Sequence, residues 1–144
     1  MDDENFQKAA IVQGAEFETL ANSFLESIGF KLRGPKVIDE IGCEIDQVVL
    51  APNGQEVYFE HKGSWRGKRP GMRRTDTVKK GLLTGFLLKS VGIEIPFCIM
   101  TSHMPDSGRA LRMINVALKD GALSSITIAN TDKAAEDLLT LFGE

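Results

Sequence analysis

The turn signal Pro52-Asn53-Gly54 constrains the fold of this 144-residue chain more than any other stretch. It separates two segments that are rich in β-branched and aromatic side chains, residues 41–51 and 56–62. Two such segments joined by an Asn-Gly turn are typical of an antiparallel hairpin. We therefore expect two neighbouring antiparallel strands in the first half of the chain.

The second of these strands ends with Glu60, His61 and Lys62. Successive strand side chains point to opposite faces, so Glu60 and Lys62 share one face and His61 points to the other. An exposed ion pair of this kind is common and contributes little to stability. The pair gains a functional meaning only if the rest of the chain brings further polar groups to it.

The register of the hairpin decides whether Asp46 is such a group. A two-residue turn at residues 53–54 would pair Asp46 with His61 and turn its side chain away from Glu60. A loop of three or five residues, or a bulge, would instead place Asp46 opposite or diagonal to Glu60. We expect the odd-length loop or the bulge.

The start of the chain predicts a helix over about residues 5–29, because apolar side chains recur at helical spacing along one face. These side chains are Phe17, Leu20, Ala21, Phe24, Leu25 and Ile28. Gly29 is a suitable end for the helix. Glu18 lies at the edge of the apolar stripe, one turn from the small residues Gly14 and Ala21. Its carboxylate is therefore the one that can face the interior.

The remaining segments alternate between strand and helix patterns. We expect a short strand at residues 30–33 ended by Gly34-Pro35, helices at 77–91, 108–119 and 132–142, and strands at 95–101 and 125–129. Thr75 or Asp76 is expected to cap the first of these helices, and Asp132 the last. The order helix, three strands, helix, strand, helix, strand, helix predicts an α/β domain with a mixed central sheet flanked by helices.

The apolar pattern also predicts which side chains face the core. In residues 77–91 these are Val78, Leu82, Leu83, Phe86, Leu87 and Ser90, and in residues 108–119 they are Ala110, Leu111, Ile114, Ala117 and Leu118. In residues 41–51, strand alternation separates Cys43, Ile45 and Val49 from Glu44, Asp46, Val48 and Leu50.

Length and composition predict one soluble domain over residues 1–144. The chain is 42% apolar and 26% charged, close to the average of globular proteins. Its acidic start lacks the positive charge of a signal peptide, and no apolar run approaches the roughly 20 residues that span a bilayer, so we expect a cytoplasmic protein. Cys43 and Cys98 form no Cys-x-x-Cys pair, which leaves zinc sites and disulfides with little support.

Positive charge is concentrated between residues 62 and 80, which hold eight bases and one acid, while the rest of the chain has nine bases and 19 acids. A basic patch on an acidic body favours a polyanion such as DNA, because each phosphate contact releases counterions. Much of this charge falls in an expected loop at about residues 63–75. The residues expected to bind DNA are Trp65, Arg66, Lys68, Arg69, Arg73, Arg74, Lys79 and Lys80. A solvated basic loop is the alternative interpretation.

Taken in chain order, Glu18, Asp46 and Glu60-His61-Lys62 resemble the motif of the PD-(D/E)xK nuclease superfamily, which has a restriction-endonuclease-like fold. The first sixty residues are especially similar to small Holliday-junction-resolvase-type members. Those have a Gly and then a Glu on the first helix, a Gly-aromatic pair at its end, an Ile-Asp or Pro-Asp on one strand and Glu-x-Lys on the next. The matching residues here are Gly14, Glu18, Gly29-Phe30, Ile45-Asp46 and Glu60-His61-Lys62.

The resemblance implies a metal-dependent DNA endonuclease whose catalytic residues are Glu18, Asp46, Glu60 and Lys62. Magnesium, with manganese as a substitute, would be held by Asp46 and Glu60, by the backbone carbonyl of His61 and by Glu18 through a water. The ion would activate a water that hydrolyses the phosphodiester bond. Lys62 would orient that water or stabilise the transition state, and we expect it to act through its charge. A homodimer in a bacterial or phage-infected cell is the expected setting.

Two other functions remain open at this point. The same fold could serve as a catalytically inactive DNA-binding or assembly module, which would bind DNA without needing a divalent ion. The chain could also be an unrelated α/β domain in which Glu60 and Lys62 form a surface ion pair. His103 is more simply explained as a surface histidine. For Trp65 two interpretations stay open: it stacks on a base or enters a groove, or it packs under the loop.

Overall fold

The computed structural model describes residues 16–63, 71–105 and 108–144. Its elements are an N-terminal helix seen over residues 16–27, β1 (Lys31–Ile38), a 3₁₀ turn (Asp39–Ile41), β2 (Cys43–Leu50), β3 (Glu56–Lys62), a second 3₁₀ turn (Gly71–Arg73), α2 (Thr75–Ser90), β4 (Phe97–Thr101), α3 (Gly108–Asp120), β5 (Ser125–Ile128) and α4 (Asp132–Phe142). The predicted order of elements is confirmed. The expected start of the first helix and Gly14 lie outside the described residues.

The five strands form one mixed sheet in the order β1-β2-β3-β4-β5. Neighbours are antiparallel from β1 to β3 and parallel from β3 to β5. The parallel part follows from the chain itself, since α2 crosses from β3 to β4 and α3 crosses from β4 to β5. The α/β class with a mixed sheet is therefore confirmed.

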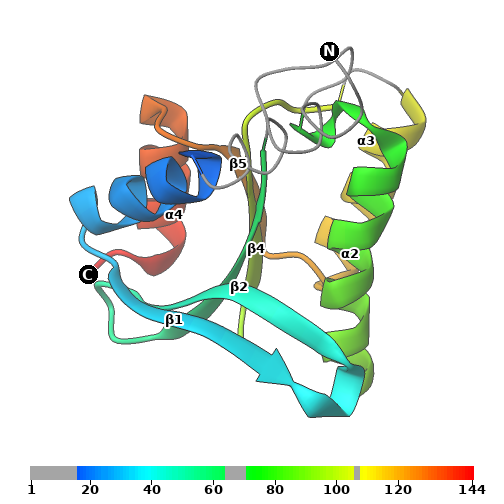
Figure 1. Cartoon of the computed structure of the whole chain (residues 1–144), viewed down its shortest axis with the longest axis horizontal. Coiled ribbons are helices and arrows are strands. Elements are labelled where there is room, and N and C mark those ends of the chain that lie inside the picture. The colour runs from blue at the N-terminus through cyan, green and yellow to red at the C-terminus, as the bar shows by residue number, and fades with distance from the viewer. Residues whose placement is uncertain (1–15, 64–70, 106–107) are drawn as a thin grey trace, which may run out of the picture.

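In the described part of the chain, four helices cover the two faces of this sheet. Figure 1 shows the N-terminal helix and α4 on one side, and α2 and α3 on the other. Two apolar cores match these layers. The first joins Phe17 and Leu25 of the N-terminal helix and Leu138 of α4 to the sheet. The second joins α2 and α3 to the opposite face through side chains such as Ile99 of β4. None of the described helices is long and apolar enough to cross a membrane.

The first strand is longer than predicted. Gly34 and Pro35 were expected to end it, yet β1 continues through them to Ile38. The pairing with β2 shifts on both sides of Gly34, whose partner is Val48. An edge strand tolerates this because a proline without an N–H can face away from the neighbouring strand. The same irregularity breaks the predicted alternation in β2, since Ile45 and Val48 pack in one core.

The expected helix caps are also wrong. Arg74 occupies the N-cap of α2 without a side-chain hydrogen bond, so neither Thr75 nor Asp76 caps that helix. In α4 the cap is Thr131, whose hydroxyl accepts a hydrogen bond from the Ala134 N–H at 3.1 Å, rather than Asp132. α2 begins two residues earlier than predicted, and Asp132 is the first residue of α4 rather than the cap before it. Such boundaries are poorly fixed by sequence.

The buried faces of α2 and α3 match the prediction in part. Val78 and Leu82 of α2 and Ala110, Ile114 and Ala117 of α3 are buried as predicted. Leu83 of α2 is 55% exposed, however, and Leu111 and Leu118 of α3 are 39% and 38% exposed. The buried face of α2 also includes Gly81 and Gly85, which let the helix backbone approach the sheet and the end of α3.

The approach at Gly85 leaves no room for a side chain. A Cβ there would overlap the carbonyl oxygen of Ala122 and would come within 3.0 Å of Phe97. Gly85→Ala should therefore lower the free energy of unfolding by about 1–3 kcal/mol, although alanine favours a helix. Urea denaturation checks this. In the matched control Gly81→Ala, the nearest atom is the mobile Cδ1 of Ile99 at 3.1 Å, so we expect a smaller loss. Equal stability of Gly85→Ala and the wild type would contradict the close approach.

Candidate functional site

The hairpin loop has five residues, 51–55, which confirms the expected odd length. Pairing runs from Leu50 with Glu56 to Gln47 with Phe59. If this register continued by one step, Asp46 would pair with Glu60. The charge of Asp46 acts on the Glu60 carboxylate, as the candidate site requires.

The β2–β3 ladder has its last backbone pair at Gln47 and Phe59, although both strands continue beyond it. At the next position a side chain makes the link: Asp46 Oδ2 accepts a hydrogen bond from the His61 backbone N–H at 2.9 Å. The Asp46 backbone in turn hydrogen-bonds to the Glu60 carboxylate. Two carboxylates thus lie where the strands stop pairing along their backbones.

Glu60 is 5% exposed, and its carboxylate has a negatively charged neighbour, Asp46, and a positively charged one, Lys62. Burial raises the pKa of Glu60 from 4.5 to about 7, and repulsion from Asp46 adds to the rise. Lys62 works against it, with Nζ 3.3 Å from Glu60 Oε2. The ion pair thus offsets only part of the cost of burying this charge.

Glu18 reaches the same region from the N-terminal helix. It is exposed, and the pKa of its carboxyl is raised by partial burial, by Asp46 and by Glu44. The helix that covers one face of the sheet therefore brings a third negative charge close to Asp46. We call Glu18, Asp46, Glu60 and Lys62 the carboxylate site.

His61 points to the opposite face, as predicted, and packs there against Phe17 and Phe59. Burial lowers its pKa to about 4, so its ring is neutral at pH 7. Its Nε2 lies 3.0 Å from Asn22 Oδ1, and the same oxygen accepts a hydrogen bond from Gln47 Nε2 at 3.2 Å. Sequence reasoning missed Asn22 and Gln47. The available signals were that Asn22 lies four residues after Glu18 and that Gln47 interrupts an apolar strand.

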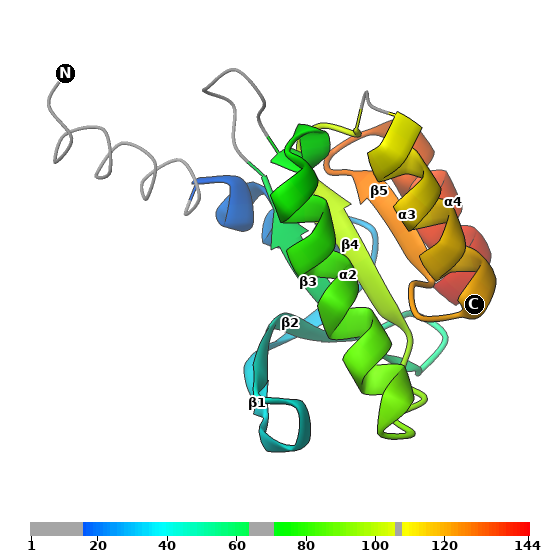
Figure 2. The same cartoon turned by 90° about the vertical axis from the view of Figure 1, so that its right-hand side faces the viewer.

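The predicted DNA-binding residues divide into two groups. Arg73, Arg74, Lys79 and Lys80 are exposed, at the start of α2 or just before it. Figure 2 shows this start at the end of the sheet where β3 and β4 finish. The Met72 N–H binds the His103 carbonyl at 3.1 Å, which ties the turn before α2 to the loop after β4. The other four residues, Trp65, Arg66, Lys68 and Arg69, lie outside the described residues.

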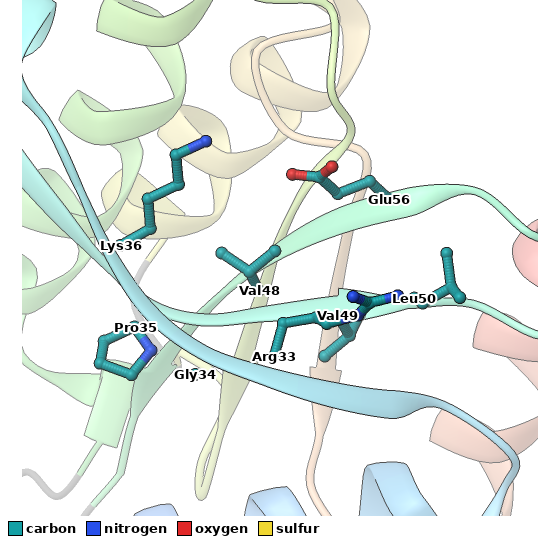
Figure 3. A pocket seen from close by; sticks show the side chains of 8 residues that line it. All are labelled: Arg33, Gly34, Pro35, Lys36, Val48, Val49, Leu50 and Glu56. Carbon is teal, nitrogen blue, oxygen red and sulfur yellow. The ribbon is translucent and has the colours of Figure 1, made fainter.

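Among the described residues, no group of three or more His, Cys, Asp or Glu side chains is arranged to hold a metal ion. The donors present are two neighbouring carboxylates, with Lys62 bound to one and the His61 N–H to the other. A hollow of about 360 Å³ lies elsewhere, over β1, β2 and the start of β3. Figure 3 shows Arg33, Lys36 and Glu56 around it, and no member of the carboxylate site lines it.

Comparisons of the chain with protein-family models, curated proteins and solved structures gave no match. The resemblance to the PD-(D/E)xK superfamily therefore stays a prediction that depends on the residues of the carboxylate site.

The raised pKa of Glu60 predicts a pH dependence of stability. A carboxyl that ionises near 4.5 when unfolded and near 7 when folded contributes less to stability as pH rises from about 4.5 to 7. This contribution of Glu60 corresponds to about 3 kcal/mol. The lowered pKa of His61 has the opposite effect over much of the same range, so the contribution of Glu60 is measured as the difference between variant and wild type. The stability of Glu60→Gln relative to the wild type should therefore rise with pH across that window. Urea denaturation with a chelator from pH 4 to 8 measures it.

Glu56→Gln is the matched control, because Glu56 is an exposed carboxylate on the same strand. We expect that variant to keep the wild-type pH dependence. Identical pH profiles for Glu60→Gln and the wild type would mean that Glu60 is not a buried, repelled carboxylate.

Proposed function

We propose that this chain is a metal-dependent DNA endonuclease with a restriction-endonuclease-like fold. The observation that supports it most is the interaction of Asp46 with Glu60, through a backbone hydrogen bond and through charge, with Lys62 bound to Glu60 and the charge of Glu18 acting on Asp46. Four residues from a helix and two strands thus meet in the order of the nuclease motif. The mixed sheet between two helical layers agrees with the proposal.

The carboxylates fit a hard divalent cation by chemistry. Asp46 and Glu60 repel each other, and a positive ion between them would remove the repulsion that raises the pKa of Glu60. Magnesium takes oxygen ligands and keeps several waters, so two carboxylates suffice when the His61 carbonyl and Glu18, through a water, contribute as well. When bound, magnesium or manganese would supply positive charge and a more acidic water.

Lys62 has a role of its own in this proposal. Its ammonium lies beside the carboxylate pair, where the phosphate undergoing hydrolysis would gain negative charge in the transition state. We propose that Lys62 moves from Glu60 to that phosphate when DNA and metal bind. A bound cation would neutralise Glu60 in place of Lys62.

The exposed arginine and lysine side chains near the start of α2 give the DNA a surface to bind. The start of α2, which Arg73 and Arg74 directly precede, lies at the end of the sheet that β3 and β4 reach, and the Glu60–Lys62 segment of β3 ends there as well. Phosphates held there would place a neighbouring phosphodiester bond near the carboxylates. Cutting both strands would need two subunits, so we propose a homodimer that acts in the cytoplasm of a bacterial or phage-infected cell.

An inactive DNA-binding module remains the second candidate. The observation that favours it is the lack of a three-residue metal-binding group among the described side chains. Such a module would bind DNA through the same arginine and lysine side chains with no dependence on a divalent ion. Activity assays of wild type and variants separate the two candidates.

Asp46→Asn should abolish magnesium-dependent cleavage. The amide keeps the shape and still accepts from the His61 N–H, but it loses the charge that holds the ion, so we expect the rate to fall by about a hundredfold or more. Cleavage of linear, supercoiled and four-way-junction DNA measures this. Asp39→Asn, at an exposed carboxylate in the turn before β2, is the control that should keep full activity. Equal cleavage rates of Asp46→Asn and the wild type on every substrate would contradict the catalytic proposal.

Arg73→Gln with Arg74→Gln should weaken DNA binding in a salt-dependent way. Each lost phosphate contact lowers the slope of log K against log salt by about 0.9, and affinity should fall alike for all sequences. Fluorescence anisotropy at several salt concentrations measures the slope. Arg109→Gln and Arg112→Gln on α3 are matched exposed controls and should leave it unchanged. An unchanged slope in the Arg73 and Arg74 variant would place the DNA elsewhere.

A further inference from the structure

On the face of the sheet opposite Glu60, three polar side chains join three elements. Asn22 Oδ1, on the N-terminal helix, accepts a hydrogen bond from Gln47 Nε2 of β2 at 3.2 Å. The same oxygen is hydrogen-bonded to His61 Nε2 of β3 at 3.0 Å. Gln47 is 5% exposed, and its Oε1 accepts from the Gly34 N–H of β1 at 2.6 Å. We call Asn22, Gln47 and His61 the polar clip.

The positions of the clip residues along the chain connect the polar clip to the carboxylate site. Gln47 directly follows Asp46, and His61 directly follows Glu60. Asn22 lies four residues after Glu18, which puts the two on the same side of the helix. Each clip residue is therefore next to, or one helical turn from, one carboxylate of the site.

We propose that Asn22 is a positioning residue that sets the position of Glu18 relative to Asp46 by fixing the N-terminal helix to β2 and β3 through its hydrogen bonds to Gln47 and His61. This inference rests on the proposed function for its consequence in metal binding, while the positioning itself can be tested without metal. Phe17 and Ala21 already attach the helix through apolar contacts. Such contacts have no preferred direction, whereas two hydrogen bonds to one oxygen fix the rotation of the helix about its axis.

The hydrogen bonds of the clip are costly to lose. The Asn22 oxygen is the acceptor for Gln47, so the neutral His61 must donate from Nε2. His61 Nδ1 is then a buried acceptor with no partner among the described residues. Removal of the Asn22 amide would leave the His61 and Gln47 donors unpaired as well, which favours a shift of the helix.

The metal-free test uses the repulsion between Glu18 and Asp46 as its readout. If the two carboxylates are held together, Glu18→Gln should raise the urea midpoint at pH 7 in the presence of a chelator. In the Asn22→Ala background the same change should raise it by less than half as much. Ser23→Ala, at the exposed neighbouring helix position, is the control background and should keep the full rise. An equal rise in both backgrounds overturns the proposal.

Asn22→Asp is the second variant, in case Asn22→Ala does not fold. Its carboxylate keeps an acceptor oxygen for Gln47 and His61, so Glu18→Gln should still raise the midpoint there. Loss of the rise in Asn22→Asp would overturn the proposal, because the acceptor would then not be what positions Glu18.

Manganese binding, measured by calorimetry, tests the consequence for the site. Asn22→Ala should weaken binding about tenfold in the wild type and less than twofold when Glu18 is already Gln. An equal loss in both backgrounds overturns the link from Asn22 through Glu18. If the wild type binds no manganese, the proposed endonuclease function fails, and the metal-free midpoints still decide whether Asn22 positions Glu18.

Discussion

The hydrogen bond from the His61 N–H to Asp46 Oδ2 is the contact on which the candidate site depends. It forms where the backbone pairing of β2 and β3 stops, so a side chain takes over the task of holding the two strands together. A slip of one residue in this register would turn Asp46 to the opposite face and replace it with a neighbour that has no carboxylate there. The five-residue loop that joins the strands fixes the register, and Gly54 supports it with a backbone φ of +87°.

The same contact helps to explain the raised pKa of Glu60. Once Asp46 is held close, Glu60 is both buried and repelled, and a single lysine does not restore its usual pKa. Natural proteins keep such costly arrangements mostly where a ligand or a reaction uses them. A divalent cation, with DNA to occupy Lys62, would turn this unfavourable arrangement into a binding site.

The two faces of the sheet contribute differently to this region. On the face toward α2, Glu60 and Lys62 lie near the start of a helix with exposed bases. On the other face, the polar clip joins the N-terminal helix to β2 and β3 behind the carboxylates. Glu18 belongs to the helix on the second face, and its charge acts on Asp46, which lies just beyond the last backbone pair of β2 and β3.

The sequence by itself determined the order of helices and strands, the mixed sheet and the face of His61, because periodicity is a local property. The odd hairpin loop was expected only because the candidate site requires it, since an Asn-Gly pair by itself favours a two-residue turn. Only the tertiary structure decided how β1 passes Gly34 and Pro35, which faces of α2 and α3 are buried, and which residue caps each helix. Leu83 is as apolar as its buried neighbour Leu82, yet it is exposed, while Gly81 and Gly85 face the sheet and the end of α3. Asn22 and Gln47 could not be assigned from sequence, since a hydrogen bond between elements 25 residues apart depends on how the helix packs on the strands.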